Sequence, residues 1–303
     1  MALSSQRQGL ACAFGAFFLW GLFPLYWKQL AAVPALEVVA HRTVWGFACL
    51  AAWVTLRRRW PEVRRVAGAP RTIVVLTAGA TLIGCNWLLY IWAVTHGHIV
   101  DASLGYYLNP LVNVLLGIVV LRERLSRGQA LAVALAAVGV ALLTLDHGGL
   151  PWIALALAGS FGLYGLVRKT VAADALEGLL WETALLAPFA AVFLVAAAAR
   201  GAGAFGHGPV QASLLLALAG VVTVVPLMLF ALGARALPLS TLGFVQYVSP
   251  SLQFLLGVFL YREPFGAAQA VAFAFIWTAL ALLTAEMRRR FERRPLEGRS
   301  TRA

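Results

Sequence analysis

The chain has 303 residues, of which 61% are hydrophobic and 12% charged, with a formal net charge of +12. A soluble globular domain carries about 25% charged residues, so this composition excludes water as the main solvent. The charges gather between apolar stretches of about 17 to 23 residues, long enough to cross a bilayer core as helices. Because a backbone in hydrocarbon must satisfy its own hydrogen bonds, these lengths favour helices over the strands of a barrel. We expect an all-α integral membrane protein.

Ten apolar segments follow one another along the chain. The first five are predicted at 10–27, 37–56, 72–94, 103–121 and 129–145, and the next five at 152–167, 179–199, 212–233, 239–260 and 267–286. Their connections are mostly short, so neighbouring helices must be antiparallel and no connection can hold a folded soluble domain. Any function must therefore lie among the helices.

Lys and Arg are distributed unevenly between alternate connections. Twenty of the 24 belong to one set, which comprises the N-terminus, the connections at 57–71, 122–127, 168–169 and 235, and the C-terminal end. The other set holds only Lys28, Arg200 and Arg262. Positive residues are retained on the cytoplasmic side, so both chain ends are predicted to be cytoplasmic. The same split accounts for the net charge without nucleic acid as a partner, and the Arg-rich end could contact anionic membrane lipids.

The chain repeats itself at an offset of 140 residues. Seven residues around the end of the fourth segment recur around the end of the ninth: Pro110, Leu115, Leu116, Gly117, Arg122, Glu123 and Gln129 match Pro250, Leu255, Leu256, Gly257, Arg262, Glu263 and Gln269. Upstream, Ala35-Leu36-Glu37 recurs as Ala175-Leu176-Glu177. Because each copy holds five segments, an odd number, the second copy enters the membrane from the opposite side.

This repeat predicts the organisation of the chain. Residues 1–145 and 146–287 are expected to be two inverted repeats of five transmembrane helices, and residues 288–303 a basic cytoplasmic tail. Inverted repeats of this kind give many secondary transporters two alternating access states around a site at the bilayer midplane.

Several runs of residues also resemble one known family. They are FLWGLFPLYWK from Phe18, HRTVWGF from His41, NWLLYIWAV from Asn86, DASLGYYLNPLVNVLLG from Asp101, GLVRK from Gly165 and LSTLGF from Leu239. They are similar to the RarD branch of the EamA group, within the drug/metabolite transporter superfamily, from about Gln8 to Ala285. The resemblance implies a ten-helix carrier of the inner membrane with a central cavity between its repeats.

Polar residues inside the segments are few, and such residues usually face the interior of a helix bundle. The amide candidates for a solute cavity are Asn86, Asn109, Asn113, Gln246 and Gln253. Asn113 and Gln253 are repeat equivalents, each three residues after a proline. These amides could bind a solute, or they could hydrogen-bond one helix to another.

The aromatic candidates for the cavity are Trp20 and Tyr164, which are repeat partners, and Tyr90. Such rings could stack on a planar solute, pack in the core or anchor a helix at the membrane interface. We predict that Asn113 and Gln253 border one cavity near the bilayer centre, with Asn86, Trp20 and Tyr164 around it.

Prolines interrupt three of the segments and are the hinge candidates: Pro110, Pro226 and Pro250. Inside a helix each would remove a backbone donor and free a carbonyl group. Prolines are also tolerated in membrane helices for packing alone.

Arg42 and Glu182 are the clear charges within the segments, and they are repeat equivalents. Each lies about 7 Å from its own membrane face at about 1.5 Å per residue, and the faces are opposite in a core about 30 Å thick. We therefore expect no direct ion pair. Arg42 is expected to extend to the outer face and Glu182 to the cytoplasmic headgroups. Glu182 is also the candidate for carrying a coupling proton.

The leading hypothesis is a secondary transporter that moves a small organic solute or metabolite, including a drug, across the inner membrane by alternating access. The alternative is a non-transporting membrane sensor or scaffold, which would not need an inverted repeat with central polar residues. No HExxH or GxSxG motif and no nucleotide-binding loop occurs, and Cys12, Cys49 and Cys85 have no metal or redox spacing. We therefore expect no enzyme, metal or cofactor. The pattern specifies neither the solute, the direction, the coupling ion nor the oligomeric state.

Overall fold

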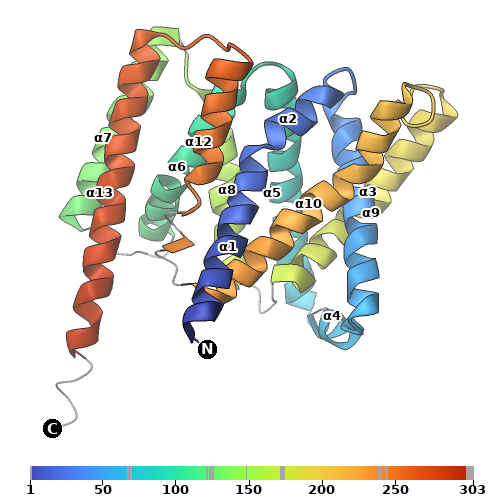
Figure 1. Cartoon of the computed structure of the whole chain (residues 1–303), viewed down its shortest axis with the longest axis horizontal. Coiled ribbons are helices and arrows are strands. Elements are labelled where there is room, and N and C mark those ends of the chain that lie inside the picture. Colours follow the sequence, from blue (N-terminus) through green and yellow to red (C-terminus); the bar gives the residue numbers. More distant parts are fainter. Residues whose placement is uncertain are drawn as a thin grey trace.

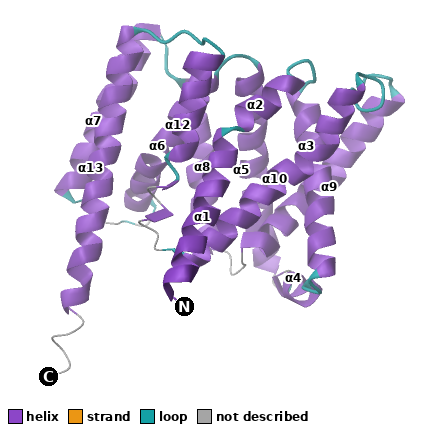
Figure 2. Ribbon diagram, in the orientation of Figure 1, coloured by secondary structure: helices purple, strands orange, loops and turns teal. Residues whose placement is uncertain are grey.

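The computed structural model describes residues 2–66, 68, 70–120, 122, 126–147, 149–170, 175–237, 241–242 and 245–297. These residues form a helical bundle (Figure 1), and within the described ranges no strand is present (Figure 2). The elements of the first half are α1 (Ala2–Gly21), α2 (Phe23–Trp27), the 3-10 helix η1 (Lys28–Leu30), α3 (Ala35–Leu56), α4 (Trp60–Val66), α5 (Pro70–Thr95), α6 (Ile99–Val119) and α7 (Arg127–His147). Those of the second half are α8 (Trp152–Thr170), α9 (Ala175–Ala199), α10 (Val210–Ala236), α12 (Val248–Leu255), the π-helical turn η2 (Leu256–Leu260) and α13 (Ala267–Glu297).

Each of the ten predicted segments coincides with a helix or a pair of consecutive helices in the described part of the chain. In those ranges, eight helical stretches are long and apolar enough to cross a membrane, and two shorter apolar helices, Trp152–Arg168 and Val248–Leu260, match the predicted sixth and ninth segments. Large apolar side chains also cover the outside of the bundle, as at Val119, Phe189 and Val192, which are 76%, 77% and 70% exposed. Such a surface suits lipid rather than water, and the chain is a multi-pass membrane protein.

The helices depart from the predicted segments in three places. The first segment divides at Leu22, just before Pro24, and the connection after α3 contains the short helix α4, which was not predicted. The last helix continues to Glu297, so much of the basic segment expected as a tail extends α13. Part of the predicted ninth segment, residues 238–240 and 243–244, lies outside the described residues.

The connections divide between the two ends of the bundle. The start of α1, the short helix α4 and the far end of α13 lie at the lower side of Figure 1. The connections after η1, α5, α9 and η2 lie at the upper side. The chain therefore crosses the bundle from side to side with each long helix.

The helices pack in a pattern that combines elements from both halves of the chain. In this pattern α1 packs on α10 and α12, α8 packs on α5 and α6, and α3 packs on α9 and α10. The remaining contacts include α5 with α9 and α6 with α12, while α7 and α13 pack on each other at one edge of the bundle (Figure 1). Each of the long helices of the first half, α1, α3, α5, α6 and α7, therefore packs against at least one helix of the second half.

One crossing is close enough to require glycine. At Gly220 on α10, an added Cβ atom would lie 2.4 Å from the carbonyl carbon and 2.5 Å from the carbonyl oxygen of Trp45 on α3. These are backbone atoms that cannot turn aside, so a side chain at this position would push the two helices apart. Small residues at such crossings allow membrane helices to gain van der Waals contact.

Candidate functional site

The interior contains an arginine surrounded by aromatic rings. Arg42, in the second turn of α3, is 4% exposed. Its guanidinium carbon lies 4.1 Å from the ring centroid of Trp87 on α5, 5.4 Å from that of Trp27 and 5.8 Å from that of Phe23. The expectation that Arg42 extends to the outer face is wrong, because these rings attract the cation and hold its side chain against α5.

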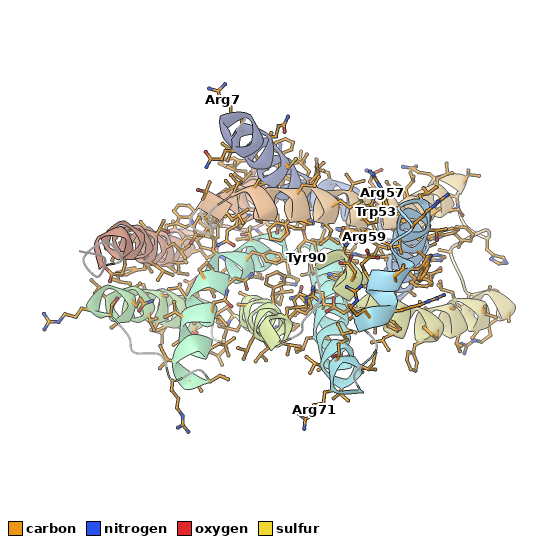
Figure 3. The ribbon with its side chains drawn as sticks, turned by 90° about the horizontal axis from the view of Figure 1, so that it is seen from below. Arg7, Trp53, Arg57, Arg59, Arg71 and Tyr90 are labelled. Atoms are coloured by element: carbon orange, nitrogen blue, oxygen red, sulfur yellow. The ribbon has the colours of Figure 1, made fainter. Side chains whose placement is uncertain are left out.

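Two tyrosines complete the surroundings of this arginine. Tyr90 is 3% exposed, and its ring meets that of Tyr106 edge to face with centroids 5.6 Å apart. Both phenols are close enough to interact electrostatically with Arg42. The hydroxyl of Tyr90 is buried and has no hydrogen-bond partner in the described part of the chain. Seen from below, Tyr90 lies near the middle of the bundle, between α10 and the helices α5 and α8 (Figure 3).

Glu182 lies in a second interior cluster, between α9 and α8. It is 1% exposed, and its Oε2 accepts a hydrogen bond from the hydroxyl of Tyr164 at 2.9 Å. Its Oε1 is 3.6 Å from Nη1 of Arg168, one turn further along α8. The expectation that Glu182 reaches the headgroups is wrong, because these two residues hold its carboxylate inside the protein. Arg42 and Glu182 therefore have separate partners and do not pair.

A row of aromatic rings runs between the two clusters. It continues from Tyr106 to Phe161, with centroids 6.3 Å apart, and from Phe161 to Tyr164, with centroids 6.1 Å apart. Asn86 lies near this row, at 1% exposure, and its amide donates to the carbonyl of Leu157 at 3.1 Å and to Oγ of Ser160 at 2.9 Å. Asn86 thus joins α5 to α8, which is the structural alternative considered for it.

Gln253 and Asn113, which were predicted to border one cavity, do not share an environment. Gln253 is 2% exposed and donates to the carbonyl of Trp20 at 3.3 Å and to Oγ of Ser249 at 3.1 Å. Its repeat equivalent Asn113 is exposed on α6. The structure therefore gives these two amides different surroundings.

The remaining cavity candidates from the sequence are Trp20, Asn109 and Gln246. Trp20 packs against Phe17 and Phe230, with ring centroids 5.3 and 5.6 Å away. Asn109 is 8% exposed with no partner for its Oδ1 in the described part of the chain, and Gln246 is half-buried before α12. Trp20 accordingly contributes to the packing of α1 on α10.

The hinge candidates differ in their local structure. Pro110 and Pro226 lie inside α6 and α10, where each removes a helix hydrogen bond. Pro250 is the third residue of α12, and the first turn of a helix has no intrahelical partner for its N–H groups. The expectation that Pro250 interrupts the middle of a helix is therefore wrong. A further proline, Pro188, lies inside α9 and was not predicted as a hinge.

Glu37 and Glu177 make reciprocal contacts that the sequence did not predict. Glu37, at the start of α3, accepts a hydrogen bond from the backbone N–H of Ala204, after α9, at 2.6 Å. Glu177, at the start of α9, pairs with Arg59, after α3, at 2.7 Å. Both glutamates are 3% exposed. Their repetition in the sequence was recognised, but a contact with a distant connection has no local signal.

The residues one turn further along α3 and α9 contact the same two connections. The ring of His41 lies against Phe205, with centroids 4.9 Å apart, and Nε1 of Trp181 donates to the carbonyl of Val63 at 2.8 Å. One set of contacts lies at the upper end of the bundle and the other lies beside α4 at the lower end (Figure 1).

Glu263 has a different structural role, at the upper end of α6. Its two carboxylate oxygens accept hydrogen bonds from the backbone N–H groups of Ile99 and Val100, both at 2.8 Å. These groups belong to the first turn of α6, which lacks intrahelical acceptors and favours negative charge. Glu263 therefore caps α6.

A cavity of 680 Å³ lies elsewhere, between α6, α12 and α13. Among the described residues that line it are Tyr107, Tyr247, Ser251, Phe254, Leu255, Trp277, Leu280, Ala281, Thr284 and Ala285. The hydroxyls of Tyr107 and Ser251 are hydrogen-bonded to each other at 2.7 Å. None of the candidate site residues from the sequence is among these lining residues.

Comparison with known proteins gives the family. The EamA-like transporter family matches residues 7–145. Protein RarD of Escherichia coli (strain K12) is 47% identical over 282 residues, covering 93% of this chain and 95% of that protein. An uncharacterized transporter of Vibrio cholerae is 47% identical over 280 residues, covering 92% of this chain and 93% of that protein.

A more distant relative and a solved structure are also similar to this chain along nearly its whole length. The chloramphenicol-sensitive protein RarD of Pseudomonas aeruginosa is 32% identical over 279 residues, covering 91% of this chain and 93% of that protein. One protein crystal structure shares the fold, with a TM-score of 0.60 at 19% identity, over 94% of this chain and 99% of that one. With relatives this similar along nearly its whole length, the chain belongs to the RarD branch of the EamA-like transporter family.

Proposed function

We propose that this membrane transporter is a secondary carrier that moves a small organic solute or metabolite across the inner membrane by alternating access. Its two repeats are the halves 1–145 and 146–287, each of five transmembrane helices and of opposite topology, with both chain ends in the cytoplasm. The single observation that carries the proposal is the reciprocal contact of Glu37 and Glu177 with the opposite half of the chain.

That reciprocity is what an inverted repeat requires. Exchanging the halves turns Glu37 into Glu177, and it turns the connection after α9, which Glu37 contacts, into the connection after α3, which Glu177 contacts. The two contacts lie at opposite ends of the bundle. A carrier with one closing contact per membrane face can release one face while the other stays closed, which is the requirement of alternating access.

The contacts between helices have the same symmetry: exchanging the two repeats converts one set of contacts into another. The contacts of α1 with α10 and α12 become, on exchange, the contacts of α8 with α5 and α6, and both sets are present. Likewise α3 with α10 corresponds to α9 with α5. The pairs α3 with α9, α6 with α12 and α7 with α13 map onto themselves. Both Arg122 and Arg262, which are repeat equivalents, have left-handed backbones with φ of 55° and 53°.

A buried glutamate is the candidate for coupling transport to a proton. Glu182 is buried between α8 and α9 with Tyr164 and Arg168 as partners, so a proton gained or lost there changes the charge inside the bundle. We propose that it carries the coupling proton, and that Pro110 and Pro226, which each remove a backbone hydrogen bond inside α6 and α10, act as hinges.

Reconstitution tests this function against a sensor or scaffold. Proteoliposomes are loaded with a mixture of small metabolites, and the contents are measured by mass spectrometry with and without a pH gradient. We expect at least one organic solute to cross faster and saturably when the protein is present. Fluxes equal to those of protein-free liposomes for every compound would contradict the proposal.

The topology has a separate test in a cysteine-free background. Single cysteines that replace Glu62 and Arg293 are expected to react with an impermeant maleimide only from the cytoplasmic side, and one that replaces His207 only from outside. Labelling of position 207 from the cytoplasm would contradict the ten-helix topology.

A further inference from the structure

We infer that Arg42 binds the negatively charged group of the transported solute, which makes the substrate class small organic oxyanions, either carboxylates or phosphate esters. This inference deepens the proposed transport function and rests on it. Arg42 is neither the coupling candidate, Glu182, nor a member of the two closing contacts, which Glu37 and Glu177 make.

The first argument is the balance of buried charge. Each buried carboxylate in the described part of the chain has a partner within the protein: Glu37 has a backbone amide, Glu177 has Arg59, Glu182 has Tyr164 and Arg168, and Glu263 has two backbone amides. Arg42 is buried to the same degree, yet no hydrogen bond or ion pair reaches it within the described ranges. A charge removed from water is normally paired and hydrogen-bonded, so an anion is the missing partner.

The aromatic rings do not replace that anion. The contact of the guanidinium with Trp87 at 4.1 Å covers one flat face of the group. The N–H bonds of a guanidinium lie in its plane, and an overlying ring leaves them unsatisfied. A planar fork of donors backed by an aromatic ring suits bidentate recognition of a carboxylate or phosphate.

The second argument is the concentration of unused donors. Nε of Arg42, the hydroxyl of Tyr90 and Nε1 of Trp27 are all buried without a hydrogen-bond partner in the described part of the chain. Trp27 and Tyr90 both lie near the guanidinium. Buried donors are rarely left unused, and three of them around one cation can be satisfied together by the oxygens of a bound anion.

The third argument is space. Gly46 lies one turn after Arg42 on α3 and is buried, but a Cβ atom added there would meet no atom within 4 Å. Residues four apart lie on the same face of a helix. The face of α3 that presents Arg42 therefore has open space beside it, and it is here that we place the body of the organic anion, with its charged group at the guanidinium.

The experiment uses the purified full chain in lipid nanodiscs and measures the unfolding temperature against concentration of defined probes. The probes are benzoate and phenyl phosphate, with benzamide and benzyl alcohol as neutral counterparts and sodium chloride as the inorganic control. A ligand that binds the folded state alone raises the unfolding temperature with its concentration. We expect one or both organic anions to stabilise the wild type and the neutral compounds to have no effect.

Three variants locate the effect. Arg42→Gln should weaken anion binding about 30-fold or more, since it removes the charged partner. Tyr90→Phe should weaken it about tenfold and should leave the unliganded protein as stable as before, because the hydroxyl has no protein partner to lose. Gly46→Leu should weaken binding by filling the room beside Arg42, with the arginine intact. If Arg42→Gln does not fold, the other two variants decide.

The matched control is Arg57→Gln. Arg57 also lies over an aromatic ring, that of Trp53, with its guanidinium carbon 5.9 Å from the ring centroid, but it is exposed. Both residues are labelled in Figure 3. This substitution should leave anion binding unchanged, which separates the effect of the buried cation from that of an arginine on a ring.

The inference is overturned if neither organic anion binds, if the neutral compounds bind equally, or if chloride alone gives the whole effect as an adventitious ion. It is also overturned if Arg42→Gln folds and binds the anions as the wild type does. Transport of a neutral solute from the metabolite mixture, unaffected by Arg42→Gln, would overturn the inference and leave the proposed carrier standing. Anion binding that depends on Arg42, with no flux of any solute, would instead contradict the carrier.

Discussion

Weakening one closing contact should open one face of the protein and leave the other closed. Glu37 accepts the Ala204 N–H at 2.6 Å, and a hydrogen bond to a charged group contributes about 1.5–3 kcal/mol, against about 0.5–1.5 kcal/mol for a neutral one. Glu37→Gln keeps an acceptor of the same shape and therefore loses about 1–1.5 kcal/mol. Since 1.4 kcal/mol is a factor of ten, the population open at that face should rise about tenfold.

Weakening the pair of Arg59 with Glu177 should open the other membrane face. Arg59→Gln leaves the carboxylate of Glu177, whose side chain is 4% exposed, without its cation. The full cost of a broken buried pair does not apply, because the side chain of Arg59 is itself 27% exposed and its charge is partly screened. We expect a shift of about the same tenfold size, now at the face that bears α4.

The assay measures the rate at which an impermeant maleimide labels one interior reporter. Gly46→Cys, in a chain without its native cysteines, places the thiol beside the unfilled room along α3. Labelling is followed in vesicles of both orientations. Glu37→Gln should raise the rate from outside about tenfold and Arg59→Gln the rate from the cytoplasm by a similar factor.

Glu62→Gln is the control, because this carboxylate on α4 has an Oε2 with no partner in the described part of the chain. It should change neither rate. If both variants raised labelling from the same side, or if neither changed it by more than about twofold, the assignment of the two glutamates to opposite faces would be refuted.

Three further substitutions separate coupling from packing. Glu182→Gln should abolish uptake driven by a pH gradient and leave counterflow exchange intact, whereas loss of both together with poor expression would mark a structural residue. Gly220→Ala should lower the free energy of unfolding by about 1–3 kcal/mol, since its Cβ would lie 2.4 Å from the Trp45 backbone, whereas Gly159→Ala, with open space around it, should not. Gln253→Leu should lower the free energy of unfolding by about 1 kcal/mol without changing solute affinity, whereas the cavity role predicted from the sequence would require weaker binding. Stability is measured by denaturation in detergent, and affinity by binding curves in the same detergent.

The sequence predicted the helices well because hydrocarbon leaves the chain few choices. The thickness of the bilayer sets the length of the apolar segments, and Lys and Arg gather in the connections between them. The predicted segments agree with the helices to within a few residues at most ends. The ninth segment was the exception. Pro250 was expected in a helix interior and lies in the first turn of α12, since the chain turns at Gln246 and Tyr247 before that helix begins.

The candidate site was harder to predict, because in an apolar helix periodicity does not distinguish the face toward lipid from the face toward other helices. Arg42 was expected at the membrane surface, and the rings of Trp87, Trp27 and Phe23 hold it inside the bundle. Repeat equivalence was also a weak guide to environment: Gln253 is buried and Asn113 is exposed. For Glu37 and Glu177, by contrast, the equivalent positions make equivalent contacts.

The most direct test of the carrier mechanism is trans-stimulation. Proteoliposomes are preloaded with the unlabelled solute identified from the metabolite mixture, and the initial uptake of the labelled solute is compared with that into empty proteoliposomes. A carrier that alternates between two faces must return its site, and a loaded site normally returns faster than an empty one, so preloading should accelerate uptake several-fold and saturably. Uptake that is unchanged by preloading and linear in concentration would indicate a channel and would contradict alternating access.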